Sequence, residues 1–234
     1  MPRLMEETRP YEFSREQFEE MLRAGWFDGR SAELVGGTVF VRDGSGHAEA
    51  REWTRDEYLQ MDDWCWFSLT RVQLIGGEVI EMPAQHDPHA AGVTLTVDAL
   101  RVAFGQGYWV RSQATLDLPP RGLPDPDVAV IPGSARGARP KHIPTSALLV
   151  VEVSDSTLQR DRTTMQSLYA AVGITDYWIL NLVQRQLEVH RNRVQDASKR
   201  FGWWYADRKI LDPGDAIAPL SLPAGKVAVD DLLP

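Results

Sequence analysis

The stretch ALLVVEVS at residues 147–154 constrains the fold of this chain most strongly. Its apolar residues follow one another almost without interruption, which is typical of a central strand that is covered on both faces. The next residues, 157–173, have the pattern of a helix that ends near Gly173. A second apolar strand follows at 176–182. This order predicts a layered domain of the α/β or α+β class with a central sheet.

Other segments on both sides of this core have recognisable patterns. Residues 90–104 have apolar positions at helical spacing. Residues 108–118 alternate as a strand does, and residues 127–131 form a short apolar strand. Residues 187–194 alternate as well, and we expect an exposed strand there with His190 at the surface. The sequence therefore predicts a mixed sheet flanked by helices.

An internal repeat occupies the front of the chain. Residues 12–41 align without a gap with residues 52–81, and nine positions are identical. Each copy begins with a capping-box pattern, which opens helices, and later contains a Gly-Gly pair, which suits a tight hairpin turn. We therefore expect a duplicated helix–hairpin, with one copy in residues 1–51 and the main domain in residues 52–234. The extra copy either serves packing or self-association, or it only extends the sheet.

Composition excludes several classes of protein. The chain has 25 Lys and Arg against 33 Asp and Glu, so its net charge of −8 argues against non-specific coating of nucleic acid. Cys65 is the only cysteine, which excludes an intramolecular disulfide and a cysteine zinc cluster. No apolar run approaches the roughly 20 residues of a membrane span, and no secretory signal is visible. We expect a cytoplasmic protein that does not enter a membrane.

Two carboxylates stand out against this apolar background. Glu152 lies inside the most hydrophobic strand, and Asp127 begins the short strand 127–131. Burying a carboxylate is costly unless it is paired or binds a cation. If the two strands are neighbours, both groups can converge on a divalent ion such as Mg²⁺, which often binds one or two carboxylates. The alternatives are that an arginine pairs with Glu152 or that Glu152 is exposed at a strand end.

Two stretches of the chain resemble the Uma-type family of restriction-endonuclease-like proteins, within the PD-(D/E)XK nuclease superfamily. They are RVQLIGGEVIEMPAQHDPH at residues 71–89 and the run from PDPDVAVI to DYWILNL at residues 124–182. The resemblance covers roughly residues 52–194. It implies a central mixed sheet flanked by helices and hydrolysis of DNA phosphodiesters with Mg²⁺, or Mn²⁺ in its place.

The same resemblance implies roles for individual residues. Asp127 and Glu152 match the metal-binding and catalytic carboxylates of the family. Glu78 matches a further acid in the hairpin, and His89 matches the histidine that opens the next helix. Three more residues match positions in the helix after Glu152: Asp161, Tyr169 and Gly173.

This chain departs from the family pattern at two positions. Met165 stands where the family has its lysine, and Gln73 stands where an acidic residue is common. Methionine can neither position an attacking water nor stabilise negative charge, and loss of one such group typically costs about 10²–10³ in rate. Arg162 or Gln166 could substitute in part. The departures indicate a weakened or lost active site, so a non-catalytic binding or assembly protein on a nuclease fold is the alternative.

Expectations about partners follow from the same residues. DNA is the partner that the family implies, although the net charge supports it only weakly. We expect a homodimer, since nucleases that cut both strands often pair about a two-fold axis. The aromatic residues in 201–206 are interpreted as packing, with stacking on bases as the alternative.

Overall fold

The computed structural model describes residues 8–120, 122–138 and 142–234. These residues pack into two compact units. The N-terminal unit contains residues 8–83 together with Pro120 and the segment 122–123, and the larger unit contains residues 84–119 and 124–234. The expected boundary after residue 51 separates two repeat copies and stays a prediction. No helix of the described residues is long and apolar enough to cross a membrane.

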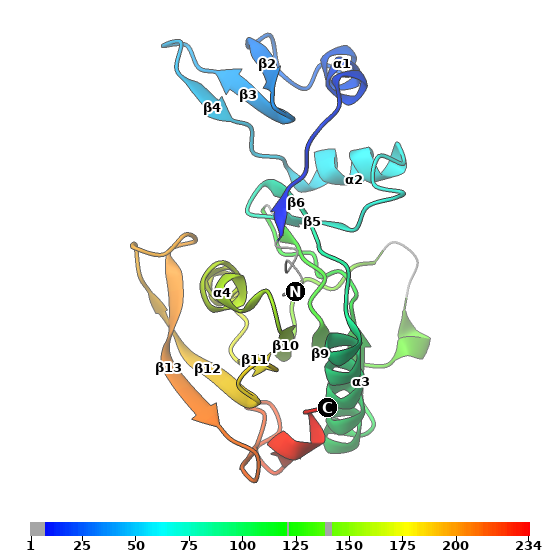
Figure 1. The fold of residues 1–234 in the computed structure, drawn as a ribbon, viewed down its shortest axis with the longest axis vertical. Coiled ribbons are helices and arrows are strands. Elements are labelled where there is room, and N and C mark those ends of the chain that lie inside the picture. The colour runs from blue at the N-terminus through cyan, green and yellow to red at the C-terminus, as the bar shows by residue number, and fades with distance from the viewer. Residues whose placement is uncertain (1–7, 121, 139–141) are drawn as a thin grey trace, which may run out of the picture. The chain divides into compact units, whose positions relative to one another are not determined.

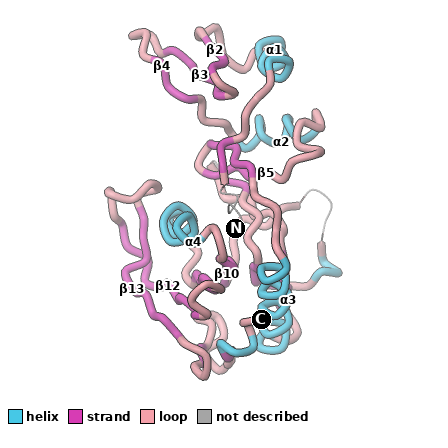
Figure 2. Tube along the Cα trace, viewed as in Figure 1, coloured by secondary structure: helices cyan, strands magenta, loops and turns pink. Residues whose placement is uncertain are grey.

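The N-terminal unit consists of two short helices and two small antiparallel sheets (Figures 1 and 2). Its elements are β1 (Arg9–Pro10), α1 (Arg15–Arg23), β2 (Ala32–Val35), β3 (Thr38–Arg42), β4 (Ala48–Ala50), α2 (Arg55–Asp63), β5 (Val72–Ile75), β6 (Glu78–Glu81) and β8 (Gly122–Leu123). One sheet has the order β2-β3-β4 and the other β1-β6-β5-β8.

The helices and hairpins of this unit recur at a spacing of 40 residues. Ser14 caps α1 with Gln17 at the third position, and Thr54 caps α2 in the same way with Glu57. Both capping boxes are therefore as predicted. The hairpins β2–β3 and β5–β6 are likewise two-residue turns on glycine pairs.

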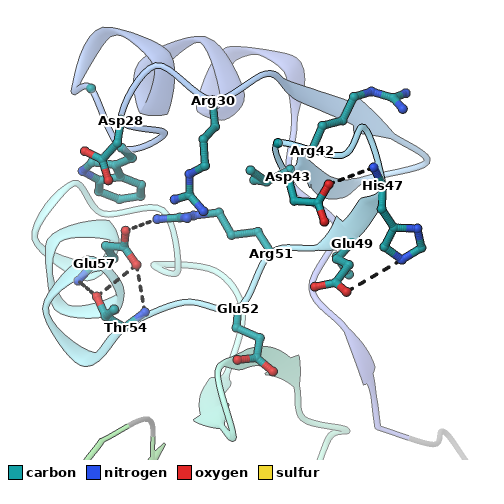
Figure 3. A pocket seen from close by; sticks show the side chains of 15 residues that line it. Asp28, Arg30, Arg42, Asp43, His47, Glu49, Arg51, Glu52, Thr54 and Glu57 are labelled. Carbon is teal, nitrogen blue, oxygen red and sulfur yellow. Dashed lines mark hydrogen bonds and ion pairs between the residues drawn. The ribbon is translucent and has the colours of Figure 1, made fainter.

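One arginine connects the two halves of the N-terminal unit. Arg51 forms an ion pair with Glu57, and its guanidinium lies over the rings of Phe27 and Trp53 at 5.4 and 4.9 Å. Arg51 and Glu57 line a polar cavity of about 870 Å³, in which Arg30 also points toward Arg51 (Figure 3). Through these contacts Arg51 connects Phe27 of the first helix–hairpin with Glu57 of α2.

The larger unit contains the remaining helices and strands. They are α3 (Asp87–Phe104), β7 (Tyr108–Ser112), β9 (Val128–Pro132), η1 (Ala135–Gly137), β10 (Leu149–Ser154), α4 (Leu158–Arg160), η2 (Asp161–Met165), α5 (Gln166–Ala171), β11 (Tyr177–Asn181), β12 (Gln186–Gln195), β13 (Trp203–Leu211), β14 (Ala216–Ile217), β15 (Val227–Ala228) and η3 (Val229–Asp231). Here η1 and η3 are 3₁₀ turns, whereas η2 is a π-helical turn that joins α4 to α5.

The core of this unit is a six-stranded mixed sheet of order β13-β12-β11-β10-β9-β7. β10 and β11 are parallel, and the other pairs are antiparallel. All six residues of β10 are buried, because α3 packs on one face of the sheet and the helical segment 158–171 covers the other. The predicted central strand and the mixed sheet flanked by helices are confirmed.

Two local predictions were wrong, and the sequence pattern does not indicate the strand β13. β7 ends at Ser112, because Gln113 adopts a positive φ of 48° and turns the chain toward Asp127. His190 is not at the surface but 1% exposed, because β12 lies beneath the helical segment 158–171 and the ring of Tyr205. The aromatic patch that begins at Phe201 continues into β13, which pairs with β12 over its whole length.

Candidate active site

Asp127 and Glu152 lie side by side in the larger unit. The antiparallel pairing of β9 and β10 ends with Val128 opposite Val151. Asp127, just before Val128, therefore lies next to Glu152, just after Val151. The backbone N–H of Asp127 donates to Glu152 Oε2 at 3.2 Å. In return, the N–H of Val153 donates to Asp127 Oδ2 at 2.9 Å. Each carboxylate residue is only 8% exposed, so the sheet itself holds two acids together in a largely dry place.

His89 fixes the other side of Asp127. The helix α3 begins at Asp87 with a proline in its first turn, which places His89 in that turn. Its Nε2 lies 3.1 Å from Asp127 Oδ2, and Gln113 Nε2 donates to Oδ1 at 3.5 Å. The histidine therefore opens the helix as the family resemblance implied, and it contacts the predicted metal-binding aspartate.

Tyr169 fixes Glu152 from the helical segment. Its hydroxyl donates to Glu152 Oε1 at 2.7 Å. Burial raises the pKa of Glu152 well above its usual range, and the charges of Asp127 and Asp161 raise it further. Burial also raises the pKa of the Tyr169 phenol, so Tyr169 keeps its proton and acts as a donor. Burial and the neighbouring acids thus disfavour the ionised form of Glu152, while the hydrogen bond from Tyr169 favours it.

Asp161 brings a third acid to the same region. Its Oδ2 accepts hydrogen bonds from Ser154 Oγ at 2.7 Å and from Thr157 Oγ1 at 2.6 Å. Burial raises the pKa of Asp161. Asp161 starts the π-helical turn η2, and such turns are frequent at functional sites. The turn thus anchors the helical segment to the end of β10.

Met165, which the family resemblance places at the lysine position, is buried. It is 1% exposed, and Arg160 Nη2 lies 3.4 Å from its Sδ. The charge of Arg160 opposes the rise in the pKa of Glu152. The expected substitute, Arg162, is engaged elsewhere, because it pairs with the buried Glu188. Sequence reasoning did not find Arg160, since nothing in the pattern shows which arginine of a helix turns toward a strand.

Two further residues of the family pattern belong to the N-terminal unit. Gln73 lies in β5 and is buried at 3% exposure, and Glu78 begins β6 with an exposed side chain. The role of Glu78 as a further acid stays a prediction.

Asp127 and Glu152 are suited to a hard cation held by two carboxylates. Burial raises the pKa of Glu152 most and the charge of Asp127 raises it further, and a cation bound between the two acids would relieve this repulsion. Within the described part of the chain, no group of three or more His, Cys, Asp and Glu side chains is arranged to hold a metal ion. Waters and substrate oxygens would complete the coordination, as is usual for Mg²⁺.

Comparisons with known proteins agree with this fold. No curated protein matches the chain. Among solved structures, one described as a putative nuclease belonging to DUF820 from Anabaena variabilis superposes with a TM-score of 0.56 at 14% identity. The match covers 76% of this chain and 96% of that one, and it shows that the two share a fold. The model of the Uma2 family, described as "Putative restriction endonuclease", matches residues 55–228. Since this match spans more than half of the sequence, the chain belongs to the Uma2 family.

Proposed function

We propose that this protein is a Mg²⁺-dependent endonuclease that hydrolyses DNA phosphodiesters, with Asp127 and Glu152 as its catalytic carboxylates and cation ligands. The observation that carries the proposal is the contact between the two acids at the ends of paired strands, with Asp127 N 3.2 Å from Glu152 Oε2. Membership of the Uma2 family supports a nuclease-like activity. Mn²⁺ is expected to replace Mg²⁺, because both prefer carboxylate and water ligands.

Each neighbouring residue has a separate task in this proposal. Val153 N–H and His89 orient Asp127, and the Tyr169 hydroxyl orients Glu152. When bound, the divalent cation supplies Lewis-acid stabilisation of the phosphate and lowers the pKa of the attacking water. Arg160 provides a fixed positive charge where Met165 provides none. Glu78 is the further acid that the family pattern proposes.

A non-catalytic binding or assembly protein on the same fold is the second candidate. The observation that favours it is the complete burial of Met165 at the lysine position. Arginine is always protonated and is therefore a poor general base, so Arg160 replaces only the charge of a lysine.

Calorimetry separates these two functions without a chosen substrate. Mn²⁺ and Mg²⁺ are titrated to roughly 10 mM, because a site with few carboxylates binds hard cations weakly. We expect binding to wild type that disappears in Asp127→Ala. Asp125→Ala is the matched control, since the carboxylate of Asp125 accepts a hydrogen bond from Thr115 in the segment after β7. Equal binding by all three proteins would refute the metal site and favour the non-catalytic function.

Activity and assembly are tested on the same proteins. Nicking of supercoiled DNA with Mg²⁺ by wild type, and its loss in Asp127→Ala, is the expected result for a nuclease. The mass in solution, measured by light scattering, tests the expected homodimer.

A further inference from the structure

The strands β12 and β13 form a ribbon that extends beyond the rest of the sheet. β11 pairs with β12 only as far as His190, whereas β12 and β13 remain paired up to Gln195 and Trp203 (Figure 1). We call residues 192–206 the ribbon tip. It contains three basic residues and one acid, in a chain whose net charge is −8. Positive charge is therefore concentrated at this edge of the larger unit.

Each basic residue of the ribbon tip lies over an aromatic ring. Lys199 Nζ is 4.3 Å from the ring centre of Trp204, and the guanidinium of Arg193 is 4.8 Å from that of Trp203. Arg200 lies 5.4 Å from the ring of Phe201. Proteins that bind single-stranded nucleic acid combine cations and aromatic rings in this way, because the cations contact phosphates and the bases stack on the rings.

The ribbon tip is held rigidly to the helix that carries the candidate site. The hydroxyl of Ser167 in α5 donates to the carbonyl of Trp203 at 2.9 Å and accepts from Phe201 N–H at 3.1 Å. Arg193 Nε donates to the carbonyl of Ala170 at 2.6 Å. Tyr169, between these two contacts in α5, is the residue that binds Glu152. A single strand of nucleic acid bound at the tip would therefore lie on a surface that is fixed to α5, the helix that contacts the candidate site.

We propose that the ribbon tip binds a single strand of nucleic acid, with its phosphates beside Lys199 and Arg200 and a base stacked on Trp204. This inference rests on the proposed function for the choice of nucleic acid as the ligand. It adds that the ribbon tip is the binding surface and that the bound nucleic acid is single-stranded. Because every base has a flat face that can stack on an aromatic ring, the tip is expected to bind with little preference for sequence.

The test measures the fluorescence anisotropy of a labelled 20-nucleotide oligothymidine and of a labelled duplex of the same length. Both are measured in EDTA at about 50 mM salt, where contacts to phosphates are strong. We expect wild type to bind the single strand more tightly. Lys199→Glu should weaken binding about 5- to 10-fold and lower the salt dependence by about one counterion. Trp204→Ala should weaken it at least about fivefold, the effect of losing one stacked base.

Two matched controls make the result specific to the tip. Lys226→Glu makes the same charge change at an exposed lysine elsewhere in the larger unit. Trp109→Ala removes another half-buried tryptophan with an arginine, Arg111, 5.2 Å from its ring, on the opposite edge strand β7. Both controls should bind like wild type. Equal weakening by tip and control variants, tighter binding of the duplex, or no binding by wild type would each overturn the proposal.

The proposal and the proposed function can fail separately. Binding that depends on the tip, in a protein that neither binds metal nor cuts DNA, leaves the inference standing and refutes the nuclease. Cleavage by wild type that is unchanged in Lys199→Glu and Trp204→Ala, with unchanged binding, refutes the inference alone.

Discussion

The guanidinium of Arg160 lies against the side chain of Met165, with 3.4 Å between Nη2 and Sδ. In the proposed function, the guanidinium of Arg160, one turn before Met165, supplies the positive charge that a lysine at position 165 would carry. We predict that Arg160→Gln lowers the rate of DNA nicking by about 10²-fold, the typical cost of one lost electrostatic stabiliser. Arg101→Gln, at an exposed arginine of α3, should have no effect. Initial rates on supercoiled DNA check this, and equal rates for both variants would contradict it.

A lysine at position 165 should restore the missing group. We predict that Met165→Lys raises the nicking rate by about 10-fold or more, because an ammonium at the position that the family resemblance assigns to lysine can both orient water and stabilise charge. The variant should lose stability, since Met165 is buried. Met165→Leu keeps the volume and is the control, with no gain in rate expected. A rate for Met165→Lys equal to that for Met165→Leu would show that the lysine position no longer serves catalysis.

The predictions succeeded where a single segment determines its own environment. The apolar run at 147–154 determines a central strand, and the capping residues Ser14 and Thr54 determine the starts of two helices. Burial of His190 and Glu188 could not be foreseen, because it depends on a helix that crosses β12 from elsewhere in the chain. The alternating pattern of β12 is the same whether one face meets water or a helix.

Glu152, a proposed catalytic residue, is also expected to reduce the stability of the folded protein. Its pKa is raised by burial, so its ionisation is unfavourable in the folded protein, and stability falls as pH rises above the ordinary value of 4.5. We predict that Glu152→Gln raises the Tm at pH 8 by roughly 2–4 °C, the shift that about 1 kcal/mol produces at this size. Calorimetric melting in EDTA measures this. A lower Tm would mean that the ionised carboxylate stabilises the fold.

The hairpin glycines of the first copy should differ in their tolerance of a side chain. Gly36 and Gly37 both have positive φ, 55° and 78°, but only at Gly37 would a Cβ meet another residue, at 2.6 Å from the Cβ of Glu12. We predict that Gly37→Ala destabilises the N-terminal unit by about 1–3 kcal/mol more than Gly36→Ala. Urea unfolding monitored by tryptophan fluorescence measures the difference, and equal losses would contradict the contact.

Glu188 is expected to cause much of the loss of stability in acid. Burial alone would raise its pKa, but contacts from His190, Arg162 and Asn181 and the charge of Arg208 lower it to about 2. Because the folded pKa lies below the ordinary 4.5, the group contributes stability above pH 4.5 and loses it as the pH falls toward 2.

We therefore predict that Glu188→Gln destabilises the protein at pH 7, by about 1–3 kcal/mol for the broken charged hydrogen bonds, and flattens the decline between pH 4.5 and 2. The free energy of unfolding in urea, measured from pH 7 to pH 3, tests both effects. Asp98→Asn, at an acid of α3 that is 66% exposed, is the control and should leave the curve unchanged. If the Glu188→Gln curve kept the wild-type slope in acid, another buried group would have to be responsible for the pH dependence.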